Sequence, residues 1–185
     1  MVRLNKIYTR TGDAGESGLV DGSRASKADP RFAAIGDVDE ANCAIGVALR
    51  TVADEQARAM LGRIQNELFD LGADLATPAG MEGALRIQPD QIERLEREID
   101  AMNEDLEPLR SFILPGGAGG SAELHLARAV ARRAERAAVA AKAGFSPEAL
   151  IYLNRLSDHL FVLARWVARE QGGDILWQPG ATRGG

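Results

Sequence analysis

The sequence predicts an all-α protein, a single domain built as a five-helix bundle. Three observations support this prediction. Apolar residues recur at helical spacing in five separate stretches, the period-two alternation of strands is nearly absent, and 185 residues suffice for one domain. A chain of this length buries roughly 70% of the surface that its unfolded form exposes, so it can build one sizeable core.

The first three helices are expected over residues 31–50, 54–76 and 89–102. In each of them apolar side chains return every three or four residues and therefore share one face. Pro89 suits a first helical turn, where a backbone N–H has no helical partner in any case. Residues 77–87, TPAGMEGALRI, are expected to link the second helix to the third.

The fourth helix is expected to follow a glycine-rich loop at residues 107–121 and contains the sequence RAVARRAER at positions 128–136. At 100° per residue its side chains divide between a packing face and a cationic face. A cationic face of this kind is most often simply solvated. It is expected to hold His125, Arg128, Arg132, Glu135 and Arg136, and the packing face to hold Leu126, Val130, Ala134, Ala137 and Ala141.

The fifth helix is expected to begin at Ser146 and to end near Glu170. Serine is a favourable cap, proline a favourable first residue, and the glutamate that follows complements the helix dipole. The segment LIYLNRLSDHLFVLARWVA is apolar on nearly all sides, so the helix is expected to be buried, and Asn154 and Asp158 then need polar partners. Arginines of the fourth helix could supply them, so the two helices are predicted to line a binding site for an anion.

The N-terminal arm, residues 8–30, contains glycines and small polar residues without periodicity and is predicted to be a loop. Its hydroxyls, its glycine N–H groups and the ammonium of Lys27 can together cradle phosphates. The spacing excludes the P-loop and the dinucleotide-binding motif. A flexible linker is the alternative, although so long an arm is uncommon unless it is functional or disordered. The tail, residues 178–185, is expected to be flexible.

Composition restricts the function further. The net charge of −5 argues against nucleic acid as a partner, because nucleic-acid binders usually carry a basic excess, and a small phosphorylated ligand suits the local arginines better. No apolar run approaches the roughly 20 residues of a membrane span, and the first residues lack the apolar segment of a signal peptide. The single cysteine, Cys43, fits a reducing cytoplasm and is expected to be a small core residue.

Three residues with rings could bind a metal or a ligand, but each also has a simpler, structural interpretation. His125 and His159 lie on packed helices without a second ligand at metal spacing, so both are expected to be structural rather than metal ligands. Phe112, in the loop sequence SFIL, would on its own be assigned to the core.

Six segments, taken in order, resemble one family. They are IYTRTGDAGESGL, the lysine of SKADPR, GDVDEAN, SFILPGG, LHLARAVARRAER and YLNRLSDHLFVLAR. Together they are similar to the PduO-type ATP:cob(I)alamin adenosyltransferases, also called corrinoid adenosyltransferases, from about Lys6 to Arg165. The chain departs from the family pattern at Ala14, where a lysine is usual, and at Ala41, where a leucine is common.

The resemblance implies a five-helix bundle that forms trimers, with ATP and a corrinoid bound at the subunit interfaces. Such enzymes transfer the 5′-deoxyadenosyl group of ATP to the cobalt of cob(I)alamin, with Mg²⁺, and release triphosphate. Because Co(I) is itself a powerful nucleophile, no protein base is needed, which agrees with a sequence that offers no nucleophile and base pair. An adenosylcobalamin-dependent enzyme that receives the product is an expected partner.

The resemblance also implies the site residues. Asp39 would pair with Arg128 across the interface. Phe112 would lie beneath the corrin ring, and Arg132 would stabilise the leaving triphosphate. ATP would be held by Thr9, Arg10, Thr11, Gly12, Ser17, Gly18 and Lys27 of one subunit and by Arg132, Arg133, Ala134, Glu135, Arg136 and Asn154 of its neighbour.

Two other functions remain open at this point. The helices could bind ATP and a corrinoid mainly to escort finished adenosylcobalamin to a dependent mutase, or they could form a structural or regulatory bundle that binds a nucleotide alone. An escort alone releases no triphosphate, and a bundle without corrinoid leaves the absorbance of cobalamin unchanged.

Overall fold

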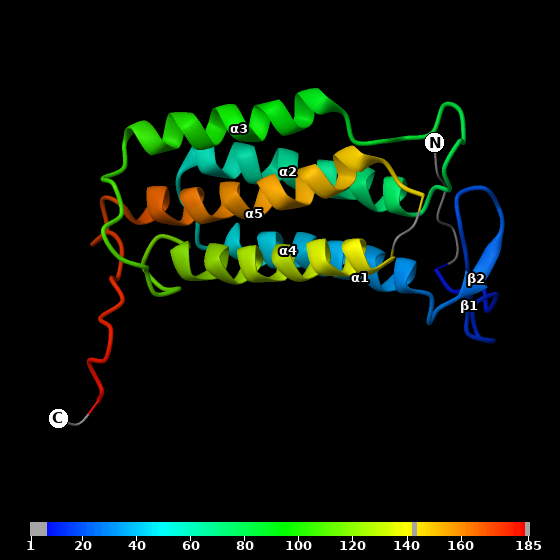
Figure 1. Ribbon diagram of the computed structural model, residues 1–185, viewed down its shortest axis with the longest axis horizontal. Coiled ribbons are helices and arrows are strands. Elements are labelled where there is room, and N and C mark those ends of the chain that lie inside the picture. Colours follow the sequence, from blue (N-terminus) through cyan, green and yellow to red (C-terminus); the bar gives the residue numbers. More distant parts are fainter. Residues whose placement is uncertain (1–6, 142–143, 184–185) are drawn as a thin grey trace.

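Five helices dominate the computed structural model, which describes residues 7–141 and 144–183. They pack side by side into an elongated bundle in which α3 lies along the outer side of α5, and α1 and α4 form the opposite side (Figure 1). The prediction of an all-α, five-helix protein is confirmed. The helices are α1 (Pro30–Ala48), α2 (Glu55–Leu75), α3 (Pro89–Glu104), α4 (Ser121–Ala141) and α5 (Pro147–Ala168).

The helices begin where the sequence provides a cap. The side chain of Asp29 precedes α1 and accepts a hydrogen bond from the N–H of Arg31 over 2.8 Å. Asp54 caps α2 and Ser146 caps α5 in the same way. Each cap satisfies a backbone donor that the helix leaves free, which typically contributes about 1 kcal/mol. These caps explain why the predicted starts agree closely with the observed ones.

The interface between α1 and α4 is built largely from alanine. Ala34 and Ala41 of α1 are completely buried, as are Ala127, Ala131 and Ala134 of α4. Small side chains let two helices approach closely, so that backbone atoms also contribute dispersion contacts. This close packing fixes the arginine-bearing helix against α1.

The buried face of α4 is rotated toward the arginines relative to the prediction. Leu126, expected to pack, is 59% exposed, whereas His125, expected on the cationic face, is buried. The prediction was wrong because alanines carry little hydrophobic signal, and the buried stripe follows them rather than Leu126. As a consequence Arg128 lies at the edge of the buried face, and its Nε atom is completely buried.

Two further expectations about burial were wrong. Cys43 is exposed on α1 and is not a core residue. Asn154 and Asp158 are exposed on α5, where they bond to Glu135 and Arg155 respectively. Helix α5 packs against α2, α3 and α4, which bury most of its circumference and leave one polar strip at the surface.

The N-terminal arm contains a small β-hairpin, so the prediction of a plain loop was wrong. Strand β1 (Glu16–Gly18) pairs antiparallel with β2 (Arg24–Ser26). In the turn, the carboxylate of Asp21 accepts hydrogen bonds from the N–H and the hydroxyl of Ser23, at 3.0 and 2.6 Å. Strands of three residues are too short to show an alternating pattern, which explains why the sequence did not reveal them.

The two ends of the bundle carry different structures (Figure 1). The hairpin lies at the end where α1 begins, and the loop between α3 and α4 lies at the other end together with the C-terminal segment. There Ile113 and Leu176 form an antiparallel bridge. Of the tail that was expected to be flexible, residues 178–183 include two turns and residues 184–185 lie outside the described residues, as does Lys6. No described helix is both long and apolar enough to cross a membrane.

A polar network joins α2, α3 and α5 inside the bundle. Glu98 of α3 pairs with Arg63 of α2, and its carboxylate lies 2.8 Å from Nε2 of the buried His159 of α5. Burial alone would raise the pKa of Glu98, but the hydrogen bond and charge of His159 and the charges of Arg63 and Arg94 lower it below its ordinary value.

We expect Glu98→Gln to lower the free energy of unfolding by about 2–3 kcal/mol near neutral pH, because Arg63 and His159 lose their shared carboxylate. Because folding depresses the pKa of Glu98, its contribution is present above the unfolded pKa of about 4.3 and is lost as the pH falls through the folded value. Urea unfolding of both proteins should therefore show a difference in the free energy of unfolding that shrinks as the pH falls below the unfolded pKa of about 4.3. A difference independent of pH would contradict the ionic role of Glu98.

Candidate functional site

The arm folds back so that Lys27 lies over Gly12. The Nζ atom of Lys27 is 3.0 Å from the position that a Cβ atom would take at Gly12, so a side chain there would displace the ammonium. The N–H of Lys27 donates to the carbonyl of Gly15 over 2.8 Å, and Gly15 has a φ of +84°, which glycine adopts readily. The structure thus brings the predicted ammonium and the predicted glycine turn together.

Residues 9–11 form an edge of this turn. The hydroxyls of Thr9 and Thr11 are hydrogen-bonded at 2.8 Å. Arg10 has a φ of +62°, a left-handed conformation that is uncommon outside glycine, and such conformations concentrate at ligand sites. Ser17 and Gly18, also predicted to contact ATP, lie in β1, where Ser17 is half-buried and Gly18 exposed.

Arg24 of β2 holds the arm in shape and was missed by the sequence analysis. Its Nη2 atom donates to the carbonyls of Thr11 at 2.7 Å and Glu16 at 3.2 Å, and its Nε pairs with the carboxylate of Glu16 at 3.4 Å. An arginine that binds carbonyls across a turn leaves no spacing pattern in the sequence, so only the folded arm could reveal it.

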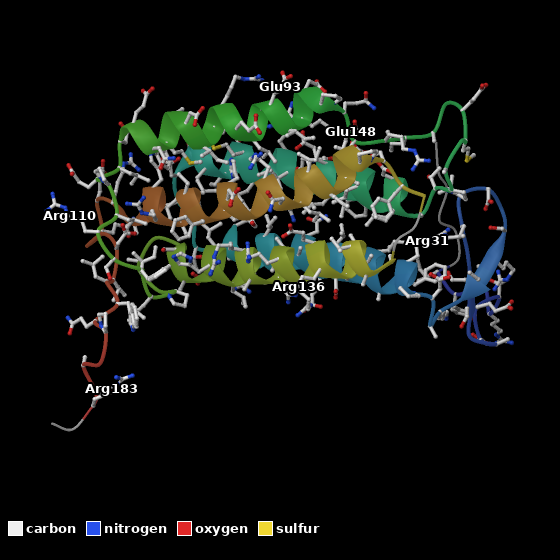
Figure 2. All side chains as sticks on the ribbon, in the orientation of Figure 1. Arg31, Glu93, Arg110, Arg136, Glu148 and Arg183 are labelled. Carbon is white, nitrogen blue, oxygen red and sulfur yellow. The ribbon has the colours of Figure 1, made fainter. Side chains whose placement is uncertain are left out.

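Arg128, Arg132 and Arg136 of α4 have few counter-charges around them. Arg132 and Arg136 are exposed, and Arg136 projects from α4 away from the bundle (Figure 2). Burial first, and then the charge of Arg132, lower the pKa of Arg128. Within the described part of the chain, none of the three forms an ion pair, and Arg132 makes only a long contact of 3.5 Å with the hydroxyl of Ser157. Clustered guanidinium groups without carboxylates favour an anionic ligand.

The other residues of α4 that were predicted to contact ATP have contacts within the chain. Arg133 turns to α1, where it pairs with Glu40 and with Asp37 at 3.2 Å, and these two carboxylates raise the pKa of its guanidinium. The side chain of Ala134 is completely buried in the core. Glu135 accepts a hydrogen bond from Nδ2 of Asn154 at 3.1 Å, which joins α4 to α5.

An aromatic pocket of about 650 Å³ opens at the start of α4. Phe112 is 78% exposed at this pocket and is therefore not a core residue. Its ring meets Trp177 edge to face with centroids 6.0 Å apart, and the N–H of Trp177 donates to the carbonyl of Phe112 over 2.8 Å. The remaining lining residues are Leu109, Arg110, Ser111, Ile113, Pro115, His125, Arg128 and Phe161.

The two histidines have different surroundings. His125 forms part of the pocket wall and meets Phe161 edge to face, and burial, followed by the charge of Arg128, lowers the pKa of its imidazole. His159 is completely buried against Glu98. The described residues contain no group of three or more histidine, cysteine, aspartate or glutamate side chains that could hold a metal ion.

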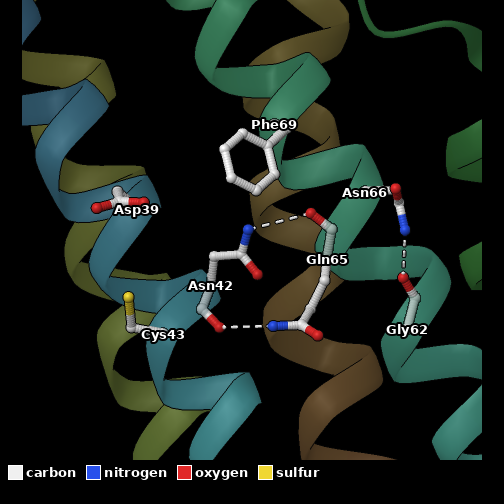
Figure 3. A pocket seen from close by; sticks show the side chains of 7 residues that line it. All are labelled: Asp39, Asn42, Cys43, Gly62, Gln65, Asn66 and Phe69. Carbon is white, nitrogen blue, oxygen red and sulfur yellow. Dashed lines mark hydrogen bonds between the residues drawn. The ribbon is translucent and has the colours of Figure 1, made fainter. Parts of the chain in front are cut away.

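A shallower pocket of about 290 Å³ lies between α1 and α2 and contains Asp39 (Figure 3). Asn42 and Gln65 form its floor and exchange hydrogen bonds with each other's carbonyls at 3.1 and 3.2 Å. Phe69 lies beside them and is 73% exposed. Asp39 has no ion pair with any residue in the described ranges, so the predicted contact with Arg128 is not made within one chain.

One chain does not bring the whole predicted site together. The arm lies at one end of the bundle, and the loop between α3 and α4, to which Phe112 belongs, lies at the other (Figure 1). Helix α4 runs between them with 21 residues, which corresponds to about 30 Å at 1.5 Å per residue. The arm of one chain therefore cannot place a nucleotide against its own aromatic pocket.

The fold and the site define a helical protein equipped to bind a phosphorylated ligand beside a large aromatic pocket. The family model of cobalamin adenosyltransferases matches residues 7–167. A corrinoid adenosyltransferase of Mycobacterium tuberculosis strain H37Rv is 51% identical over 190 residues, covering 98% of this chain and 97% of that protein.

Solved structures agree. The PduO-type ATP:corrinoid adenosyltransferase of Lactobacillus reuteri, in a phenylalanine-to-alanine variant complexed with cobalamin and ATP, is 36% identical with a TM-score of 0.87, covering 94% of this chain and 99% of that one. An arginine-to-lysine variant complexed with ATP is 35% identical with a TM-score of 0.83, covering 93% and 100%. This chain belongs to the cobalamin adenosyltransferase family, and the predicted resemblance is confirmed.

Proposed function

We propose that this chain transfers the 5′-deoxyadenosyl group of ATP to the cobalt of cob(I)alamin and releases triphosphate. The observation that carries the proposal is the cluster of Arg128, Arg132 and Arg136 without counter-charges next to the aromatic pocket of Phe112. The arginine cluster suits a triphosphate, and the aromatic pocket suits the apolar face of a corrin ring. The relatives named above are corrinoid adenosyltransferases, one of them solved with cobalamin and ATP.

The reaction is a displacement at a saturated carbon. The Co(I) electron pair forms a bond to C5′ of ATP, the bond from C5′ to the triphosphate oxygen breaks, and triphosphate leaves with that electron pair. The protein then has two tasks, to align the reactants and to stabilise the growing charge of the leaving group. Arg132, Arg136 and Lys27 perform the second task as charge-assisted donors. Mg²⁺ is usually held mainly by phosphate oxygens and water, so it enters with the nucleotide.

Phe112 acts before the transfer. Co(II) with a lower axial ligand is difficult to reduce, and an apolar ring on that side of the corrin displaces the ligand. The exposure of Phe112 at the pocket leaves its ring free to contact a corrin, and its contacts with Trp177 hold the loop in place. Phe112 is thus proposed to favour the reduction of Co(II) to Co(I).

We further propose that the active enzyme is a homotrimer whose sites are shared between subunits. The arm and the α3–α4 loop that lines the Phe112 pocket lie at opposite ends of one chain, so a second chain is proposed to complete the site. Asp39 and the half-buried guanidinium of Arg128 are suited to meet across that interface, beside the exposed ring of Phe69. A reducing cytoplasm, in which Co(I) can form, is the proposed location, and an adenosylcobalamin-dependent enzyme is the proposed recipient of the product.

We expect Asp39→Ala to reduce both trimer stability and activity, because it leaves a partly buried guanidinium without its partner. The loss should correspond to about 3 kcal/mol, more than an exposed pair contributes. Sedimentation velocity and the rate of adenosylcobalamin formation measure the two effects. A wild-type protein that sediments as a stable monomer would refute the shared site.

The overall proposal is tested by mixing chemically reduced cobalamin with ATP, Mg²⁺ and the protein. Adenosyltransfer changes the absorbance spectrum of the corrinoid and releases one triphosphate for each adenosylcobalamin formed. Binding of both ligands without triphosphate would indicate an escort protein, and ATP binding without any corrinoid change would indicate a nucleotide-binding bundle.

A further inference from the structure

A completely buried carboxylate, that of Asp74, lies beneath the place where the arm meets the bundle. Asp74 belongs to the last turn of α2. Its Oδ1 accepts hydrogen bonds from Nη1 of Arg86 at 2.7 Å and from the N–H of Ser146 at 3.1 Å. Its Oδ2 accepts from the N–H of Ile87 at 3.0 Å and from the hydroxyl of Ser146 at 2.6 Å. One side chain thereby joins α2, the segment before α3 and the start of α5.

Arg86 connects the carboxylate of Asp74 to the backbone that follows α2. Besides the carboxylate, its guanidinium donates to the carbonyls of Asp74 at 3.0 Å, Thr77 at 3.1 Å and Pro78 at 2.7 Å. A basic side chain that satisfies the last carbonyls of a helix fixes the path of the chain beyond it. The backbone on both sides of Ala76 is therefore held by one ion pair.

Ala76 is where the arm attaches to this rigid segment. Its carbonyl accepts a hydrogen bond from the N–H of Val20, just before the turn of the hairpin, at 3.3 Å. Among the described residues this backbone hydrogen bond joins the arm to the end of α2, and the other backbone hydrogen bonds of the arm lie within it or at its junction with α1. The orientation of the hairpin relative to the bundle thus depends on a carbonyl whose position Asp74 determines.

We propose that Asp74 is a positioning residue for the nucleotide arm, acting through Arg86 and the carbonyl of Ala76. The inference rests on the proposed role of the arm in binding ATP. Asp74 does not touch the arm, but it fixes the carbonyl against which β1 and its turn are placed. Lys27 directly follows β2 and lies over Gly12, which precedes β1, so the placement of the hairpin also places these two residues.

An ionised aspartate is required for this role, because it accepts all four hydrogen bonds and donates none. Burial by itself would raise the pKa of Asp74, but the donors of Ser146, Arg86 and Ile87 together lower it, so the carboxylate is ionised at neutral pH. An asparagine would keep the shape of the side chain but would turn an N–H₂ group toward donors.

The test compares Asp74→Asn with Glu67→Gln in the full-length protein. Glu67 is a second buried carboxylate of α2, bonded to Tyr152 and Arg94, so its variant controls for loss of stability alone. It precedes Ala76 by nine residues, or roughly 14 Å along the helix axis. In Asp74→Asn we expect the amide of Val20 to exchange with deuterium about tenfold faster than in the control. We also expect the KM for ATP to rise about tenfold, while the KM for cobalamin and kcat stay within about twofold.

Several results would overturn the inference. The first is exchange of the Val20 amide at the same rate as in the control, and the second is an unchanged KM for ATP. The third is a general loss of activity, in which kcat falls and both KM values rise by similar factors. If Asp74→Asn does not fold, Val20→Pro removes the docking N–H at the surface, and an unchanged KM for ATP in that variant is equally decisive. Failure of the proposed function is a separate result, because wild-type protein would then release no triphosphate, whatever the exchange rate of Val20.

Discussion

Arg132→Ala should reduce the rate of adenosyltransfer by on the order of a hundredfold, or about 3 kcal/mol of transition-state stabilisation, and should leave the fold intact. Arg132 is exposed on α4, and its helix packs through alanines on another face, so truncation removes no core contact. In the proposed reaction this guanidinium stabilises the leaving triphosphate, whose negative charge grows as the bond to C5′ breaks. Turnover with preformed Co(I) and a melting curve measure the two quantities.

Arg97→Ala provides a matched control for Arg132→Ala. Arg97 is an exposed arginine of α3 that pairs only with Glu93 at 3.7 Å, so its loss removes a surface charge far from the arginine cluster. Its variant should retain wild-type turnover. If Arg132→Ala turned over as fast as Arg97→Ala, Arg132 would have no part in the site.

Phe112→Ala should separate reduction from transfer. Without the ring, water or the base of the cofactor can coordinate the lower side of cobalt, so turnover from Co(II) and a reductant should fall by tenfold or more. With preformed Co(I), which binds a lower axial ligand only weakly, the variant should turn over at a rate close to that of the wild type. The KM for ATP should hardly change, because Lys27 and Arg132 are untouched.

The exposure of Phe112 makes the alternative to this prediction easy to recognise. A ring that is 78% exposed contributes little to the core, so the melting temperature should change little. A structural phenylalanine would instead cost about 3–5 kcal/mol of stability on truncation and slow both assays together. A lowered melting temperature with an unchanged ratio of the two rates would refute the axial role.

The helices could be predicted from the sequence because their signals are local. Caps such as Asp54 and Ser146 and the spacing of apolar residues within each segment act over a few residues, and the structure has five helices close to the predicted ranges. The arginine cluster of α4 and the glycines of the arm are equally local signals. The resemblance to one family followed from these same segments.

Errors arose where burial depends on neighbours that are distant in the sequence. Cys43 and Leu126 were assigned to the core and are exposed, because alanine contacts between α1 and α4 decide which faces are buried. Asn154 was expected to be buried and is exposed, because three helices cover the rest of α5. The hairpin of the arm was missed because its strands are only three residues long.

By itself the sequence determined the helices, their caps, the cationic stripe and the family. Only the tertiary structure decided that Trp177 lies against Phe112 and that Arg24 hydrogen-bonds across the arm. It also decided that Asp74 joins α2, the segment before α3 and the start of α5. It also placed the arm and the loop between α3 and α4, which lines the aromatic pocket, at opposite ends of the bundle, and the proposal of a shared site rests on this separation. The physical reason is that helix formation depends on residues within one or two turns, whereas these contacts join positions whose proximity exists only after the helices have packed.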